Sequence, residues 1–397
     1  MAVAIRAARL FDGENNRDKP LVLVDDGRII DVDYTGAAVP DGYETVDLGD
    51  ATLLPGLVDA HIHLVFNAGT DPVGHLAEVD DELLLVEARA AAHRALAAGV
   101  TCVRDLGDRS YLGVRLREEF AAEPAAGPDV VPAGPPITIP DGHCWFLGGA
   151  VSGVDSVREA VRERAARGAG VIKVMVTGGR MTAGTAVDAC QFTAAELRAA
   201  AVEAHRYGLP ITGHAHGRDG IAAAVHAGFD GVEHASFVTG NQVQPDPAVI
   251  AALAASGTVV SSGLPGGVPG MPVPPIIAAW LPHAIGLLRL VLDAGVCFVV
   301  GPDGGIAPHR PHDILPYAIA DLTAVMSPAQ ALSAATHDAA AACGLGERKG
   351  RLARGYDADI LAVPDDPLAD ITALHRPVAV FHRGVPVLTQ PAQPSAP

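Results

Sequence analysis

Two histidines two positions apart are the first residues of this chain whose types and spacing could do chemistry. His61 and His63 follow a Pro55-Gly56 turn and a short apolar segment that we expect to form a strand. Because side chains alternate between the two faces of a strand, both imidazoles should point the same way. Two imidazoles on one face suit a divalent metal, whose ligands converge from one side. The pair alone is also compatible with two hydrogen-bonded histidines, so a metal site needs further ligands.

Lysine usage indicates a third residue of interest. Of the 28 basic residues only three are lysines, at positions 19, 173 and 349. Lys173 lies in an apolar segment, residues 170–177, that we expect to be a strand buried on both faces. An ionised lysine there is costly unless it is paired or chemically altered. Unlike a guanidinium, its amine can lose its proton and act as a nucleophile.

Strands and helices alternate from residue 55 onward. Counting the strand of His61 and His63, we expect eight strand–helix units, and the later strands should end near Asp105, His143, Thr177, His214, His234, Ser262 and Asp303. Helices are expected at roughly 80–98, 154–168, 193–207, 218–227 and 245–255. The fold class is therefore α/β. The number of alternating strand–helix units favours a (β/α)8 TIM barrel, although a doubly wound open sheet would show the same alternation.

Local signals mark some helix ends. Thr193 to Glu196 and Ser327 to Gln330 read as capping boxes that begin helices. Gly208 and Gly344 are plausible C-terminal ends.

The two ends of the chain show short strand-like runs instead of alternating strands and helices. Residues 3–10, 21–24 and 28–33, and again 359–363 and 378–382, read as short strands. We expect residues 1–56 and 350–390 to build one small composite β-sandwich domain beside a barrel of residues 57–349. Residues 391–397 are expected to be a disordered tail.

Several of the expected strands end in a polar residue that could bind metal. In a barrel of this kind the carboxyl ends of the strands meet at one face, where active sites lie. The residues concerned are His61, His63, His143, Lys173, His214, His234 and Asp303. Each histidine taken singly could be a helix cap or a hydrogen-bonding partner, but their common placement favours a site for two metals such as zinc. Lys173 would fit as a carbamate formed with carbon dioxide, whose two oxygens can bridge two cations.

Composition narrows the class of partner and compartment. The 397 residues carry a formal net charge of −18, which argues against nucleic acid and anionic membranes as partners. We find no apolar run near the ~18 residues of a membrane span and no secretory signal. The five cysteines are scattered, without a Cys-x-x-Cys pair, which argues against a disulfide scaffold. We expect a cytoplasmic protein that acts on a small molecule and forms a homo-oligomer.

Six motifs taken together resemble the amidohydrolase superfamily. They are residues Pro55–His63, Ile172–Gly179, Gly213–Gly217, Gly231–His234, Gly301–Gly304 and Gly355–Ile360. The resemblance extends over nearly the whole chain. It is nearest to the branch of Xaa-Pro dipeptidase-like and imidazolonepropionase-related hydrolases, which includes carboxypeptidase-like and ochratoxin-hydrolysing members.

The resemblance implies a role for each residue of the site. His61, His63 and Asp303 would hold one metal, and His214 and His234 the other. Carboxylated Lys173 would bridge the two metals together with a hydroxide, the nucleophile. Asp303 would take the proton of the hydroxide and pass it to the leaving amine. One metal, with His143, would polarise the scissile carbonyl.

Other residues are candidates for contact with the substrate. His216 shares a strand face with His214 and rivals it as ligand; we assign His214 to the metal and His216 to the substrate or to a supporting position. Arg180 could pair with a substrate carboxylate or simply be solvated. His309 and His312 could line the pocket. The Pro/Gly-rich segment 263–275 could be a lid or a plain surface loop.

The expected function is hydrolysis of an amide-type C–N bond in a dipeptide, an N-acyl amino acid or a related small substrate by a binuclear metal site. One alternative is a mononuclear deaminase or cyclic-amide hydrolase of the same fold. Lys173 and the absence of a glutamate after His214-Ala215-His216 argue against it. An alternative of another class is a non-catalytic assembly protein, but this chain retains every expected ligand.

Overall fold

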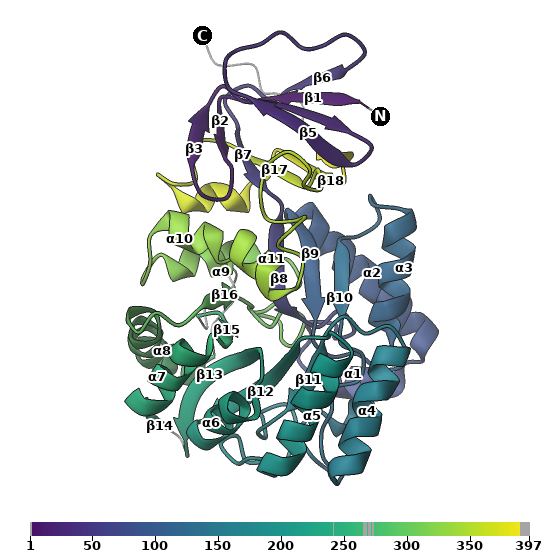
Figure 1. Cartoon of the computed structure of the whole chain (residues 1–397), viewed down its shortest axis with the longest axis vertical. Helices are drawn as coiled ribbons and strands as arrows, with labels where there is room; N and C mark the ends of the chain where they lie inside the picture. Colours follow the sequence, from purple (N-terminus) through teal and green to yellow (C-terminus); the bar gives the residue numbers. More distant parts are fainter. Residues whose placement is uncertain (1, 241, 265–267, 269–270, 272–273, 390–397) are drawn as a thin grey trace.

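The computed structural model describes residues 2–240, 242–264, 268, 271 and 274–389 of an α/β protein. Helices and parallel strands make up the larger part of the molecule (Figure 1). Two further sheets lie at the top of Figure 1, and the six-stranded one combines strands from both ends of the chain.

Eight parallel strands of the described residues form two sheets. The first sheet has the order β10–β9–β8, with β8 Leu57–Ile62, β9 Val100–Asp105 and β10 Asp129–Pro132. The second has the order β11–β12–β13–β15–β16, with β11 Ile172–Met175, β12 Ile211–Gly217, β13 Gly231–Thr239, β15 Val259–Ser262 and β16 Phe298–Val300. The short β14 (Gln242–Val243) pairs with β13. Parallel bridges connect the two sheets on both sides, Ile62 to Gly304 and Ile137 to Val174.

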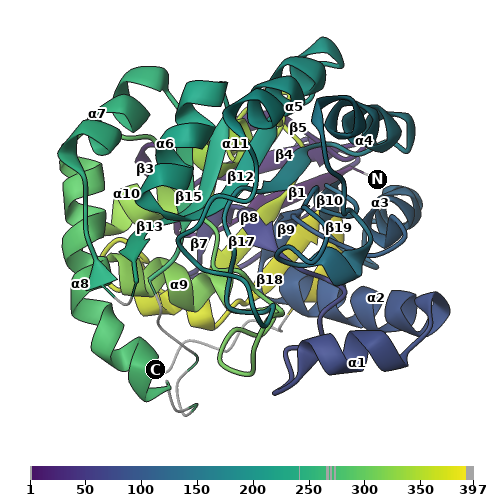
Figure 2. The ribbon, with the colours of Figure 1, turned by 90° about the horizontal axis from the view of Figure 1, so that it is seen from below.

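Helices surround these strands, as Figure 2 shows from below. They are α1 Pro72–Glu78, α2 Asp81–Ala97, α3 Leu112–Ala122, α4 Val154–Ala166, α5 Ala194–Arg206, α6 Arg218–Ala227, α7 Pro247–Ser256, α8 Pro275–Asp293, α9 Leu315–Leu322, α10 Pro328–Ser333 and α11 His337–Ala342, with 3-10 turns Trp145–Leu147 and Ile371–His375. The expected capping boxes begin α5 at Thr193 and α10 at Ser327. Gly208 and Gly344 follow α5 and α11 with φ of 67° and 73°, the left-handed conformation that favours glycine after a helix.

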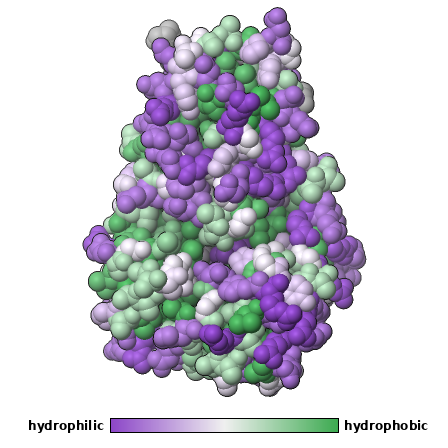
Figure 3. All heavy atoms as spheres, viewed as in Figure 1, coloured by the Kyte–Doolittle hydropathy of each residue, from purple (hydrophilic) through white to green (hydrophobic). Residues whose placement is uncertain are grey.

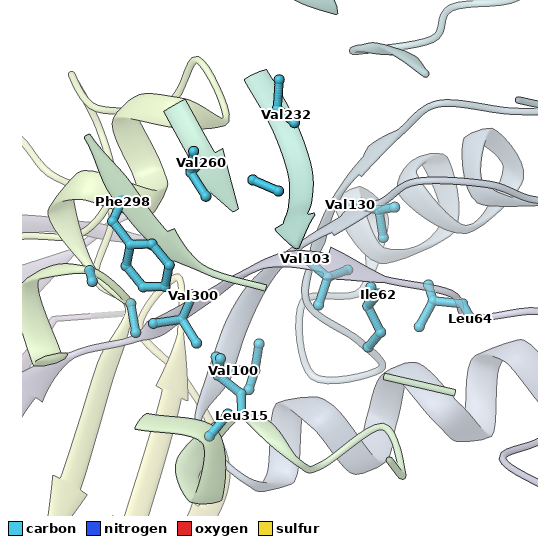
Figure 4. Close-up of a cluster of buried hydrophobic side chains, with 14 of the residues drawn as sticks. Ile62, Leu64, Val100, Val103, Val130, Val232, Val260, Phe298, Val300 and Leu315 are labelled. Atoms are coloured by element: carbon cyan, nitrogen blue, oxygen red, sulfur yellow. The ribbon is translucent and has the colours of Figure 1, made fainter. Parts of the chain in front are cut away.

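The parallel strands are buried on both faces, which explains their continuous apolar runs. Figure 4 shows Val103 of β9, Val260 of β15 and Phe298 of β16 in one cluster of buried side chains. This core fixes the strands, and therefore the residues that follow their carboxyl ends.

Two further sheets are built from the ends of the chain, one from N-terminal strands alone and one from strands of both ends. One has the order β5–β4–β1–β6, with β1 Val3–Arg6, β4 Leu21–Asp25, β5 Arg28–Asp33 and β6 Glu44–Asp47. The other has the order β19–β18–β17–β7–β2–β3, with β2 Arg9–Phe11, β3 Asn16–Asp18, β7 Thr52–Pro55, β17 Ile360–Val363, β18 Ala379–His382 and β19 Val385–Thr389. Ile5, Leu53, Ile360 and Phe381 share one buried cluster, so both chain ends contribute to a single apolar core.

A buried ionic cluster joins the start of β10 to the segment before β17. The Lys349 ammonium lies 2.7 Å from Asp129 and 3.2 Å from Asp357, and it also contacts Asp359. The lysine is 2% exposed, so its charge depends on these carboxylates rather than on water.

Four sequence expectations need correction or fall outside the structure. The third parallel strand ends at Pro132, and His143 lies in a turn rather than at a strand end. Pro135, Pro136 and Pro140 explain this difference, because proline cannot donate a ladder hydrogen bond. The run 3–10 is two strands interrupted at residues 7–8. Most of segment 265–273 and the tail 391–397 lie outside the described residues, so the lid and the disordered tail stay predictions.

The outer surface mixes hydrophilic and hydrophobic residues on the face shown in Figure 3. Among the described helices, none is both long and apolar enough to cross a membrane.

Candidate metal centre

The first donor group brings together the carboxyl ends of β8 and β16. His61 and His63 have their Nε2 atoms 3.3 Å apart. Asp303 places Oδ1 3.4 Å from Nε2 of His61 and 3.3 Å from Nε2 of His63. All three residues are buried. Three donor atoms converging from one side is the arrangement that a divalent metal requires.

The second donor group lies at the ends of β12 and β13. His214, His216 and His234 have ring nitrogens within 4.8 Å of one another. The ring centroids are 4.6 Å apart for each of the three pairs. His216 Nδ1 also lies 2.9 Å from Ser236 Oγ, whereas His214 Nε2 lies 3.2 Å from the carbonyl oxygen of Gly178. The geometry therefore places both His214 and its rival His216 beside His234.

Two residues of the donor groups have unusual backbone conformations. His234 has φ of 70° and Asp303 has φ of 61°, in the left-handed region that non-glycine residues rarely adopt. Such conformations cost of order 1–3 kcal/mol each and are concentrated at functional sites. The strained backbone directs both side chains toward the common cavity.

Lys173 of β11 lines the same cavity as both donor groups. It is 1% exposed, and its Nζ makes no hydrogen bond within the described residues. Burial lowers the pKa of Lys173 to about 8, against the opposing effect of Glu233 and Asp303. The amine is therefore easier to deprotonate than an ordinary lysine.

A buried glutamate contacts His61 of the first donor group. Glu233 places Oε2 2.9 Å from Nδ1 of His61, the ring nitrogen that faces away from Asp303. The other oxygen of Glu233 accepts hydrogen bonds from Arg104 (3.0 Å) and Thr212 (2.6 Å). Burial favours the neutral carboxyl, but Arg104 and His61 outweigh it and hold the pKa of Glu233 well below its usual range. A carboxylate behind a ligand histidine fixes the orientation of its ring.

His143 reaches the cavity from its turn, with its ring centroid 4.6 Å from that of His214. Gln191 Oε1 accepts a hydrogen bond from the His143 amide at 2.6 Å, and Thr182 Oγ1 lies 3.2 Å from its Nδ1. These contacts hold the ring in place although no strand carries it.

Burial keeps most of these imidazoles neutral. It lowers the pKa of His61 and of His143 to about 4 and that of His216 to about 3. His63 is the exception, since the Asp303 carboxylate outweighs burial and raises its pKa. A neutral imidazole has a free lone pair, which is the form that binds metal. The donor set therefore fits divalent metal ions.

The cavity in front of the donor groups has a volume of about 900 Å³. Its wall at α8 is mostly apolar, with Trp280, Ala284, Leu287, Leu288 and Val291, and it also carries His283. Arg180, His309 and Arg310 also line it. His312 is buried instead below His63, with Nε2 3.2 Å from the His63 carbonyl oxygen.

The structure thus gathers every residue singled out as a metal ligand, together with His143, His216 and Arg180, around one cavity. The sequence reasoning missed Glu233, Arg104 and Arg310. Glu233 had a signal of the same kind as Lys173, namely a charged residue within a buried apolar strand. Arg104 and Arg310 had no such signal, and only the spatial arrangement shows that Arg104 contacts Glu233 and that Arg310 lines the cavity.

The sequence profile of the Amidohydrolase family matches residues 52–387. The chain belongs to the amidohydrolase family. Ochratoxinase from Aspergillus niger is 28% identical over a 415-residue alignment that covers 94% of this chain and 82% of the relative. Imidazolonepropionase from Deinococcus radiodurans is 27% identical, with 82% of this chain and 81% of the relative covered. A crystal structure of a Xaa-Pro dipeptidase with bound methionine superimposes with a TM-score of 0.85 at 26% identity, covering 97% of this chain and 99% of that one.

These relatives confirm the branch of the superfamily that the motifs indicated. They also establish the class of activity. This amidohydrolase is a hydrolase of amide-type C–N bonds.

Proposed function

We propose that this protein is a binuclear metal-dependent hydrolase that cleaves an amide bond in a small substrate. The observation that carries the proposal is Lys173, a buried amine that has no hydrogen-bond partner among the described residues and lies in a cavity that also holds two groups of metal-type donors. A bare ammonium in that position would be unfavourable. Its conversion to a carbamate explains both its burial and its lack of a partner.

Carboxylation of Lys173 is chemically accessible at neutral pH. The neutral amine attacks carbon dioxide, a C–N bond forms and one proton is released, which leaves a carbamate anion. With a pKa of about 8, about a tenth of the amine is neutral at pH 7, far more than for an unburied lysine. In the proposal the carbamate is shared by two divalent ions, best matched by zinc, with His61, His63 and Asp303 on one ion and His214 and His234 on the other.

Bound divalent metals would acidify a water molecule and polarise the scissile carbonyl. Asp303 would transfer the proton of the attacking water. Asp303, whose pKa is held well below its usual range by His61 and His63 despite burial, is ionised and can accept the proton of the attacking water. As the oxygen of water bonds to the carbonyl carbon and the C–N bond breaks, Asp303 returns the proton to the leaving nitrogen. His143, fixed by Gln191 and Thr182, would orient the carbonyl oxygen.

The proposed substrates are dipeptides, N-acyl amino acids and related small amides. The names of the relatives support this class: an ochratoxinase and a Xaa-Pro dipeptidase match over nearly the whole chain. The cavity of about 900 Å³ is large enough for such molecules. His216 and Arg180 are proposed substrate contacts, since both line the cavity.

We further infer that the eight parallel strands form one (β/α)8 barrel of residues 57–349. The bridges between the two sheets on both sides support this inference. The apolar core shared by residues from both ends supports a composite β-sandwich of residues 1–56 and 350–390.

The decisive experiment combines metal analysis of the purified protein with detection of the carbamate on Lys173. The proposal expects about two divalent ions per chain and a modified lysine. One ion per chain with an unmodified lysine would instead favour a mononuclear deaminase or cyclic-amide hydrolase of the same fold. Release of free amino acid from a panel of dipeptides and N-acyl amino acids then tests the activity itself.

A further inference from the structure

The cavity has two chemically different sides. One side carries the donor groups and Lys173. The other is mostly apolar and is formed by residues of α8, namely Trp280, Ala284, Leu287, Leu288 and Val291, together with His283. A substrate that fills this cavity must therefore place an apolar group against α8 while its amide faces the donors.

Arg310 adds a positive charge to the cavity on the side of Asp303. It lines the cavity, and its side chain is 18% exposed. One guanidinium nitrogen, Nη1, donates to the carbonyl oxygen of Pro302 at 2.7 Å and lies 4.0 Å from Oδ2 of Asp303. Within the described part of the chain, Nε and Nη2 of Arg310 make no hydrogen bond. A planar guanidinium with free N–H groups is suited to bind a carboxylate.

Among the described residues, the charge of Arg310 has one carboxylate within 4.0 Å. Asp303 is its nearest carboxylate, but in the proposed function that carboxylate serves a metal ion and the transferred proton. A largely buried arginine is stabilised when an anion completes its coordination. Arg180, the other arginine at the cavity, is exposed and its charge is screened by water.

We propose that Arg310 is the residue that recognises the carboxylate of the substrate, so that the enzyme selects amides of α-amino acids with an apolar side chain. The separation of 4.0 Å between Arg310 and Asp303 would place the bound carboxylate next to the leaving nitrogen. This inference rests on the proposed function and extends it from a reaction to a substrate class.

The test compares pairs of substrates that differ only in the carboxylate. The probes are N-acetyl-leucine, N-acetyl-phenylalanine and N-acetyl-methionine, each paired with the N-acetyl amino alcohol in which CH2OH replaces the carboxylate. The wild-type enzyme should favour the acid by about 100-fold in kcat/KM, a typical effect of a buried charge contact. Arg310→Gln should lose most of its activity on the acids, mainly through KM, and keep its activity on the alcohols, so that the preference falls below about tenfold. Arg310→Lys should recover part of it.

Two further variants separate the alternatives. Arg289→Gln removes an exposed arginine of α8 that donates to the Ala324 carbonyl oxygen, and it should retain the wild-type preference. If Arg180→Gln rather than Arg310→Gln removes the preference, or if neither does, the assignment to Arg310 is wrong. Because Arg310 also contacts Pro302, metal content is measured for each variant; activity on the alcohols shows that Asp303 is still in place. No hydrolysis of either substrate by metal-loaded wild-type protein would instead contradict the proposed function.

Discussion

The carboxylate of Glu233 lies against His61 of the candidate metal centre, with Oε2 2.9 Å from Nδ1. Because Nδ1 faces the glutamate, Nε2 is left to face His63 and Asp303. In the proposed metal site, this buried carboxylate would set which nitrogen of His61 is free to bind metal.

The first prediction follows from this contact. Glu233→Gln should weaken metal binding by about 10- to 100-fold, because the neutral amide orients the ring less strongly and makes it less basic. Competition with a chelator measures the affinity. Glu203→Gln is the matched control, since Glu203 is a buried glutamate of α5, outside the cavity lining, that is paired with Arg162 of α4 and Arg206 of α5. Equal affinities of the two variants would show that Glu233 does not position His61.

The second prediction concerns the pH dependence of carboxylation. Burial lowers the pKa of Lys173 to about 8, so its neutral fraction rises with pH and levels off above that value. When metal and a fixed concentration of carbon dioxide are returned to metal-free protein, the initial rate of recovery of activity should rise roughly 50-fold from pH 6 to 8 and less than about twofold from pH 8 to 9.

The same experiment discriminates against other titrating groups. His61 has a pKa of about 4 and is neutral throughout this range. Against the effect of burial, Asp303 raises the pKa of His63, so the control for that group is Lys173→Met, which keeps His63. Lys173→Met should show no recovery that depends on carbon dioxide. A tenfold rise between pH 8 and 9 would instead indicate a lysine with an ordinary pKa, contrary to the prediction.

The third prediction tests Asp303 as the group that transfers the proton. Asp303→Asn should lower kcat by about 10²- to 10⁴-fold, because the amide cannot accept the proton of the attacking water. Activity is measured at saturating zinc, so that weaker metal binding does not account for the loss. Asp321→Asn on α9, outside the cavity lining, should remain close to wild type. Full activity of Asp303→Asn would rule out this role.

The fourth prediction concerns stability rather than catalysis. Lys349→Met should lower the free energy of unfolding by about 3–5 kcal/mol, because it leaves Asp129, Asp357 and Asp359 as buried carboxylates without their central cation. Denaturant unfolding followed by circular dichroism measures the change. Arg158→Met, which breaks an exposed pair with Asp155, should change stability by less than about 1 kcal/mol. A similarly small effect for Lys349→Met would show that the ionic cluster does not stabilise the contact between the start of β10 and the segment before β17.

The sequence by itself determined the periodic elements and the residues of unusual chemistry. The capping boxes at Thr193 and Ser327 depend on neighbouring residues only, and the structure contains both. His61 and His63 share a face because strand geometry is local. Lys173 was recognisable because an amine in an apolar strand is costly wherever that strand lies.

Only the tertiary structure decided what these residues meet. The turn that brings His143 to His214 follows prolines that end a strand early, and its final position depends on Gln191 and Thr182, about 40 to 50 residues away in sequence. Glu233 contacts His61, and Arg310 and α8 line one cavity, only because distant strands and helices pack around one core. Such contacts arise from the packing of the whole chain, which no local pattern of residues encodes.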